Sequence, residues 1–212
     1  MKLKNNFLLF ATTLICLFLT FDFQKVESQT SVKMEPSIKF VIEKGEVKEF
    51  LLPNGLKILL KSNHSIPLIT FSIWYKVGSR NETEGQYGLA HFLEHMMFKG
   101  TKKLKKGEIS SIIQNYGGIF NAFTSSDCTA YYETISPKYL EKVLEIESDR
   151  LKGSLIKGEE LNLERTVVLS ELEGDLNNPV TLLDQELRAS AYEISPYKHP
   201  TIGYEKDVRN IN

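Results

Sequence analysis

Residues 88–98, GLAHFLEHMMF, constrain the fold of this 212-residue chain more than any other stretch. If the segment is helical, apolar side chains occupy nearly every face of it, a pattern that predicts a buried helix. His91, Glu94 and His95 are the exceptions. Because residues four apart lie on one face of a helix, the two imidazoles point in the same direction. The fold must supply partners for these side chains, since a buried polar group without a partner is costly.

A metal ion is one possible partner. Two histidines on one face can bind zinc, and three protein ligands with an open fourth position form the catalytic arrangement. Glu94 lies on the adjoining face, where it can take a proton from a metal-bound water without being a ligand. The alternative is that His91 and His95 are ordinary packed residues of a core helix.

A third ligand has to come from another element. The helix predicted over 158–176 carries Glu164 and Glu171, seven apart and therefore on one face. Glu173 and Asp175 lie on its other faces. Spacing alone does not choose among these four carboxylates, and a solvated surface is the commoner place for any one of them.

The remaining pattern predicts an α+β domain. Asn54-Gly55 between apolar runs indicates a hairpin, and the β-branched and aromatic stretch 68–77 predicts a central strand. Further strands are predicted over 119–125 and 128–135, helices over 107–116, 137–151, 158–176 and 180–193, and a loop-like tail from 194. Strands followed by interleaved helices favour an antiparallel-rich sheet with helices on one face.

The N-terminus predicts a signal peptide over 1–28. Two lysines precede an uncharged run at 7–21, FLLFATTLICLFLTF, whose 15 residues fall short of the roughly 18 of a membrane-spanning helix. We therefore expect an exported protein, periplasmic or secreted; an uncleaved membrane anchor is the alternative. Residues 29–45 predict an irregular segment, so the folded domain is expected over 46–212.

Charge and cysteine content narrow the function classes. The formal net charge is −1, which gives no electrostatic case for nucleic-acid binding. The basic cluster at 102–106, KKLKK, is typical of a solvated loop. After signal cleavage only Cys128 would remain, which excludes an internal disulfide.

Three motifs together resemble the insulinase/pitrilysin family, zinc metallopeptidases that carry HxxEH in place of HExxH. They are GSRNETEGQYGLAHFLEHMMFKGT at 78–101, GGIFNAFTSSDCTAYYETI at 117–135 and ERTVVLSE at 164–171. The resemblance extends from about residue 46 to the end and favours the bacterial relatives of the mitochondrial processing peptidase β subunit.

This resemblance implies a specific site. One Zn²⁺ per chain would be bound by His91, His95 and Glu171, with Glu94 as the general base. Glu164 would support the ligands, and Asn121 and Ala122 would bind the backbone of a short or unfolded polypeptide by strand addition.

Family members carry at least two related domains, so we expect this chain to be an N-terminal domain that is incomplete at its C-terminal end. Its expected partner is a complementary C-terminal half or a homologous subunit. Three functions are then possible: a zinc endopeptidase, a zinc-binding inactive remnant or half of a split peptidase, and a structural subunit. The retained HxxEH disfavours the structural subunit.

Overall fold

A computed structural model describes residues 38–212, which form two compact units divided between Pro67 and Leu68. Each unit is described by itself. The signal peptide predicted over 1–28 lies outside the described residues and stays a prediction.

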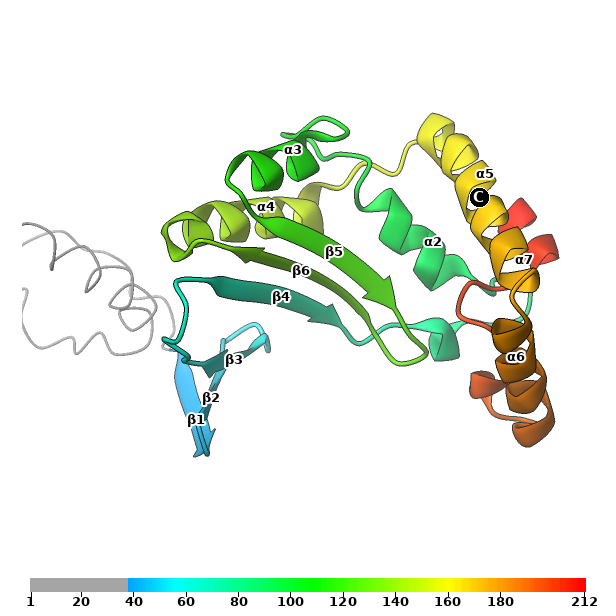
Figure 1. The fold of residues 1–212 in the computed structure, drawn as a ribbon, viewed down its shortest axis with the longest axis horizontal. Helices are drawn as coiled ribbons and strands as arrows, with labels where there is room; N and C mark the ends of the chain where they lie inside the picture. Colours follow the sequence, from blue (N-terminus) through cyan, green and yellow to red (C-terminus); the bar gives the residue numbers. More distant parts are fainter. Residues whose placement is uncertain (1–37) are drawn as a thin grey trace, which may run out of the picture. The chain divides into compact units, whose positions relative to one another are not determined.

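The first unit is an antiparallel sheet with the strand order β1-β2-β3 (Figure 1). Its strands are β1 (Lys39–Lys44), β2 (Val47–Leu51) and β3 (Lys57–Lys61). The predicted hairpin is confirmed, because Leu51 pairs with Lys57 across the turn that contains Gly55.

The prediction of an irregular segment over 29–45 was wrong for residues 39–44. Gly45 adopts a positive φ of 62° and turns the chain back, so that β1 pairs with β2. All six residues of β1 are exposed. Backbone pairing therefore forms this strand without burial, and hydrophobic patterning does not detect it.

The second unit contains an antiparallel sheet with the strand order β4-β6-β5. The strands are β4 (Ile69–Tyr75), β5 (Ile119–Thr124) and β6 (Thr129–Ile135). Helices cover one face of this sheet (Figure 1), which confirms the predicted α+β class. The stretch 68–77 is not central, however: β4 is an edge strand of the sheet formed by residues 68–212. Its alternating burial belongs to a strand with one covered face.

The predicted helices are confirmed, with short 3₁₀ turns between some of them. The α-helices are α2 (Leu89–Met96), α3 (Glu108–Asn115), α4 (Leu140–Gly153), α5 (Gly158–Leu176), α6 (Pro179–Ala191) and α7 (Glu205–Asn210). The 3₁₀ turns are η1 (Ser79–Asn81), η2 (Pro137–Tyr139) and η3 (Pro196–Lys198). Ile109, Ile113, Val143 and Ile146 pack α3 and α4 against the sheet through Ile135.

A second apolar cluster joins α2, α5 and α7. Phe92 and Met96 of α2 pack with Val168 of α5 and with Val208 and Ile211 at the C-terminal end. The prediction of a loop-like tail from 194 was therefore wrong for residues 205–210. α7 has only six residues, too few for a periodic signal. Tertiary contact stabilises it, including a hydrogen bond from Arg165 of α5 to the Val208 carbonyl (3.3 Å).

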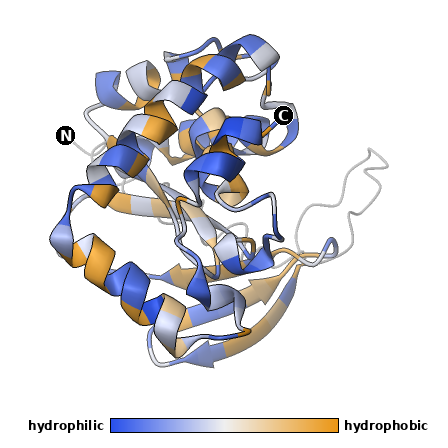
Figure 2. Cartoon of the chain, turned by 90° about the vertical axis from the view of Figure 1, so that its right-hand side faces the viewer, coloured by the Kyte–Doolittle hydropathy of each residue, from blue (hydrophilic) through white to orange (hydrophobic). Residues whose placement is uncertain are grey.

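The outermost helix, α6, has no buried residue. Val180, Leu183 and Leu187 are among its exposed apolar side chains. Figure 2, in which the right-hand side of Figure 1 faces the viewer, shows apolar residues among the polar ones on the helices there. Within residues 38–212, no helix combines the length and the apolar character needed to cross a membrane.

Candidate metal centre

The start of α2 is held by groups from outside the helix. The Glu82 carboxylate accepts hydrogen bonds from the amides of Gly88 (2.8 Å) and Ala90 (2.7 Å), which would otherwise lack partners at the helix N-terminus. Gly88 has φ +97°, and a Cβ there would lie 2.4 Å from the Ile202 carbonyl oxygen. The chain therefore needs glycine at this position, and His91 follows one turn from a fixed point.

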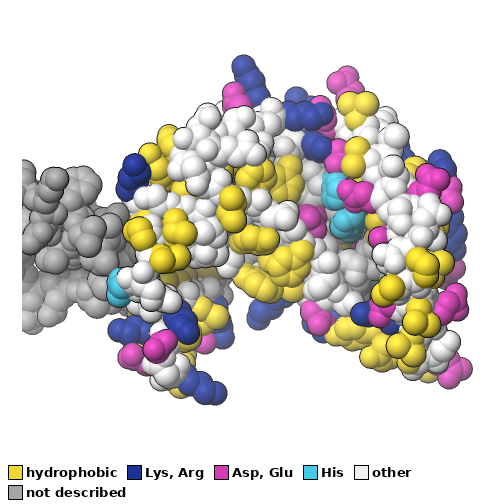
Figure 3. All heavy atoms as spheres, viewed as in Figure 1, with side chains coloured by type: hydrophobic (Ala, Val, Ile, Leu, Met, Phe, Trp, Pro, Cys, Tyr) yellow, Lys and Arg dark blue, Asp and Glu magenta, His cyan; other side chains and the backbone are white. Residues whose placement is uncertain are grey.

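Two histidines and one carboxylate converge between α2 and α5. Nε2 of His95 lies 3.4 Å, and Nε2 of His91 3.9 Å, from Oε2 of Glu171. A ligand atom from each residue lies within 4.8 Å of the other two. Figure 3 shows histidine and acidic side chains reaching the surface together between the sheet and α5. The spacing of these donors fits a single cation.

The electrostatics also favour a cation. Burial, together with the neighbouring His95, lowers the pKa of His91 to about 4, so this imidazole is neutral at pH 7. A neutral imidazole offers a lone pair, which is the form that binds zinc. Glu171 supplies the negative charge from a side chain that is 46% exposed, so the site is open to solvent on that side.

Glu94 is buried beside the three converging residues, on α2. Its Oε2 accepts a hydrogen bond from the Thr124 hydroxyl of β5 (2.5 Å). Burial raises the pKa of Glu94, and the charge of Glu171 raises it further, while Thr124 and His95 oppose the rise. A carboxylate with a raised pKa is a better proton acceptor, which suits a general base.

Glu164 lies behind His95 and away from the convergence point. Its Oε1 is 2.8 Å from Nδ1 of His95, and its Oε2 forms an ion pair with Lys99. Burial raises the pKa of Glu164, but the hydrogen bonds from Lys99 and His95 outweigh it and hold the pKa below its ordinary value. Glu164 therefore stays ionised and contacts a histidine nitrogen that does not face Glu171.

The structure separates the four acidic candidates on α5. Glu171 joins the histidines, and Glu164 contacts His95 from the other side. Asp175 lines a neighbouring hollow of about 720 Å³, which also touches His91 and Glu171. Glu173 lines neither this hollow nor the smaller one at the histidines.

Asn121 lies in the wall of the smaller hollow, which has a volume of about 390 Å³ and also contains the two histidines, Glu94 and Glu171. Its Oδ1 accepts a hydrogen bond from the Ala122 amide (2.9 Å). Both residues belong to β5, an edge strand of the sheet formed by residues 68–212. The candidate substrate-binding strand and the candidate metal ligands thus share one hollow.

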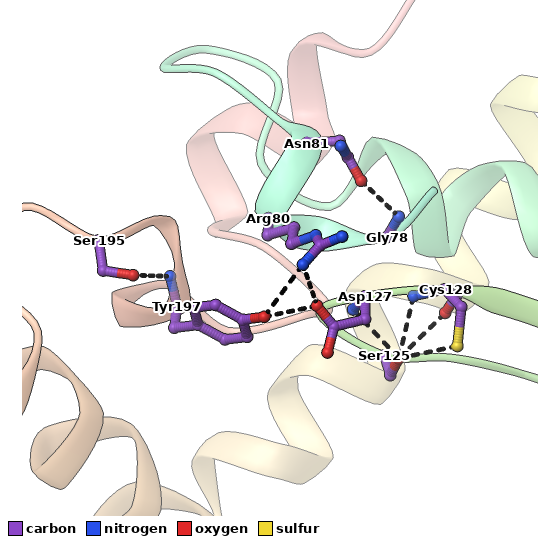
Figure 4. A network of polar contacts seen from close by, with 8 residues as sticks. All are labelled: Gly78, Arg80, Asn81, Ser125, Asp127, Cys128, Ser195 and Tyr197. Atoms are coloured by element: carbon purple, nitrogen blue, oxygen red, sulfur yellow. Dashed lines mark hydrogen bonds and ion pairs between the residues drawn. The ribbon is translucent and has the colours of Figure 1, made fainter. Parts of the chain in front are cut away.

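The turn between β5 and β6 is fixed to η1 and η3 (Figure 4). Arg80 pairs with Asp127 (2.7 Å), and the Tyr197 hydroxyl contacts both. The Ser79 amide donates to the Ser125 carbonyl (3.1 Å). These contacts hold Ser125, which lines the larger hollow, against η1.

Three residues at the site were not singled out from the sequence: Glu82, Thr124 and Lys99. All three lie inside motifs that resemble the family, and strand alternation places Thr124 on the same face as Phe120. Nothing in the local pattern joins Lys99 to Glu164, because their contact depends on how α2 and α5 cross.

Comparison with known proteins gives concordant results. Residues 57–205 match the family described as Insulinase (Peptidase family M16). "Zinc protease PqqE" of Helicobacter pylori is 39% identical over 166 residues, which cover 75% of this chain and 36% of that protein. A probable mitochondrial-processing peptidase subunit β of Arabidopsis thaliana is 32% identical over 171 residues, covering 81% of this chain and 32% of that protein.

A solved structure is also similar. The crystal structure of a protease from Helicobacter pylori superimposes with a TM-score of 0.75 at 36% identity, covering 78% of this chain and 40% of that one. The chain therefore spans about a third of the length of the curated relatives it matches.

Proposed function

Because the chain belongs to the insulinase family, peptidase family M16, we propose that it is the N-terminal part of a zinc metalloendopeptidase. Its substrates would be short or unfolded polypeptides. The convergence of His91, His95 and Glu171 beside the buried carboxyl of Glu94 carries this proposal.

His91, His95 and Glu171 would hold one zinc ion. When bound, zinc lowers the pKa of a water molecule and polarises the carbonyl of the peptide bond. The His91 imidazole is already neutral at pH 7, so binding needs no proton to be removed from it.

Glu94 would act as the general base. It lies on the same helix as both histidines but is not one of the three converging residues. It would take the proton from the attacking water and deliver it to the leaving amine. The Thr124 hydroxyl, which donates to Glu94 Oε2 at 2.5 Å, would fix the orientation of the carboxylate.

Asn121 and Ala122 would position the substrate. An extended peptide can add to a free strand edge through backbone hydrogen bonds, and within the sheet of residues 68–212 β5 offers such an edge beside the histidines. A substrate carbonyl would replace Asn121 Oδ1 as the acceptor for the Ala122 amide. A tightly folded protein cannot present an extended strand in this way.

A second candidate is half of a split peptidase, or an inactive zinc-binding remnant. The names of similar proteins favour it. Some of those relatives are named as subunits. Half of a split peptidase would bind zinc and cleave peptides only with a partner chain, whereas an inactive remnant would bind zinc and cleave none.

A peptidase assay separates these functions. The purified chain is incubated with an unstructured fluorogenic peptide, with and without a chelator, and Glu94→Gln serves as the blank. A zinc endopeptidase is expected to show chelator-sensitive turnover that Glu94→Gln abolishes while keeping its zinc. Loss of zinc in Glu94→Gln would make Glu94 a ligand and overturn the assigned mechanism.

A further inference from the structure

Lys99 lies beyond the last turn of α2 and has no role in the function proposed above. Its ammonium group forms an ion pair with Oε2 of Glu164, and the other oxygen, Oε1, lies 2.8 Å from Nδ1 of His95. The Lys99 and His95 side chains are each 16% exposed and that of Glu164 is 8% exposed. Lys99, Glu164 and His95 thus form a partly buried chain of contacts, in which Glu164 of α5 lies between the other two.

The two oxygens of the Glu164 carboxylate have different partners. A carboxylate can accept hydrogen bonds at either oxygen, and rotation about its last side-chain bond exchanges them. Lys99 occupies Oε2, so Oε1 is left for His95. An imidazole that donates from Nδ1 to a carboxylate keeps its lone pair on Nε2. In this structure Nε2 of His95 is the nitrogen that faces Glu171, at 3.4 Å.

We propose that Lys99 is a positioning residue for the metal centre: it fixes the Glu164 carboxylate, which in turn fixes the ring orientation and tautomer of His95. This inference rests on the proposed function, because the nitrogen it presents is a proposed zinc ligand. Lys99 acts through Glu164: it lines the smaller hollow but is not one of the three converging residues.

The chain offers a matched control for this lysine. Lys106 forms an ion pair with Glu160 (2.6 Å), one turn earlier on α5, but Glu160 contacts no histidine. Lys106→Met therefore removes a lysine–glutamate pair from the same helix and leaves the histidines unaffected. If Lys99→Met weakens zinc binding only because α5 is attached less firmly, Lys106→Met should weaken zinc binding too.

The first measurement is zinc affinity by chelator competition on the full chain. Loss of an outer partner of a metal-binding histidine typically weakens metal binding about 10–100-fold. We expect Lys99→Met to weaken zinc binding by about tenfold, Lys99→Arg to restore most of it, and Lys106→Met to leave it unchanged. Adding Lys99→Met to Glu164→Gln should cause little further loss, because residues that act as one chain are not additive.

The second measurement needs no metal. Nitrogen NMR of the metal-free chain reports the tautomer of His95, which is expected to be Nδ1–H in the wild type and in Lys106→Met, and mixed in Lys99→Met. Unchanged affinity and tautomer in Lys99→Met would overturn the proposal, as would fully additive losses in the double variant. If the wild type binds zinc no better than His91→Ala, the zinc site itself fails. That outcome is separate from the effect of Lys99 on the tautomer.

Discussion

At the residue scale, the third ligand can be tested by comparing Glu171 with Glu173, two positions further along α5. Oε2 of Glu171 lies 3.4 Å and 3.9 Å from the histidine Nε2 atoms, whereas Glu173 is exposed and outside that group. We predict that Glu171→Gln sharply reduces the zinc content of the purified chain from about one ion, because a neutral amide is a poor replacement for a carboxylate ligand. Elemental analysis measures this.

Glu173→Gln is the matched control, since it removes the same charge from the same helix. Its zinc content should equal that of the wild type. Full zinc in Glu171→Gln together with loss in Glu173→Gln would show that the ligand assignment is wrong.

Glu82, which holds the start of α2, gives a prediction for pH. Burial raises the pKa of Glu82 to about 7, and the charge of Asp207 adds to the rise against the two amide hydrogen bonds. An unfolded glutamate has a pKa of about 4.3. The folded state therefore binds this proton more tightly, so the contribution of Glu82 to stability falls as pH rises from about 4.3 to 7 and is constant above that.

Comparison of two variants isolates this contribution. Glu82→Gln cannot ionise, so its free energy of unfolding should fall less steeply than that of the wild type between pH 4.5 and 7. Glu84→Gln, in the same loop and exposed, should follow the wild type. Urea unfolding at several pH values measures the slopes, and parallel curves for Glu82→Gln and the wild type would contradict the prediction.

At the scale of elements, α2 is held in place by a buried charge on α4. Arg150 is fully buried, with its guanidinium 4.8 Å from the Phe98 ring centroid and 4.6 Å from that of Tyr131. Its Nη2 lies 2.8 Å from Glu147 and 3.4 Å from Glu133. Because the Tyr131 hydroxyl reaches the carbonyl of Glu94 (3.5 Å), this cluster supports the helix that carries the candidate base.

We predict that Arg150→Met destabilises the fold by about 3–5 kcal/mol, because it leaves two buried carboxyl groups without their cation. Replacing Glu133 and Glu147 by glutamine as well should recover part of that loss. Urea unfolding measures both effects.

An exposed arginine provides the comparison. Arg209 pairs with Glu205 (2.7 Å) on the surface of α7, and Arg209→Met should cost less than about 1 kcal/mol. Equal losses of unfolding free energy in the two arginine variants would mean that burial does not increase the contribution of Arg150 to stability.

At the scale of the whole molecule, catalysis needs more than the metal centre. Correct positioning of a substrate can lower a barrier by about 7–11 kcal/mol, and the hollows at this site are open to solvent on the side of Glu171. We predict that the chain alone is weakly active, and that a partner subunit increases cleavage of unstructured peptides, since some relatives are named as subunits.

The assay compares the chain with and without that partner, with Glu94→Gln in each mixture as the blank. Strong chelator-sensitive turnover by the chain alone, as a monodisperse monomer, would show that no partner is needed.

Export is a separate prediction for the whole chain. The basic start and the apolar run at 7–21 favour cleavage near Ser28. Mass spectrometry of the N-terminus from the native host should find a chain that begins close to residue 29. An intact Met1 on a cytoplasmic protein would refute export.

The sequence by itself determined most helices and strands of this protein and the part of the site that lies on α2. The strands of six or seven residues and the helices of eight or more are long enough to be recognised from their residue types, so the sequence predicted α2, α5 and the sheet. It also placed His91, Glu94 and His95 together, since these three share one short helix. The six-residue α7 and the exposed β1 carry no such pattern, and both were missed.

The other half of the site depends on contacts between distant segments. Glu164 and Glu171 lie on one face of α5, and spacing could not say which of them meets the histidines. The packing of α2 against α5 decides this, because it places Glu171 at the Nε2 atoms and Glu164 at Nδ1 of His95. The same packing brings Lys99 to Glu164, and the sheet brings Thr124 to Glu94. A one-dimensional pattern specifies which face a residue occupies, but only the packing of elements specifies which faces meet.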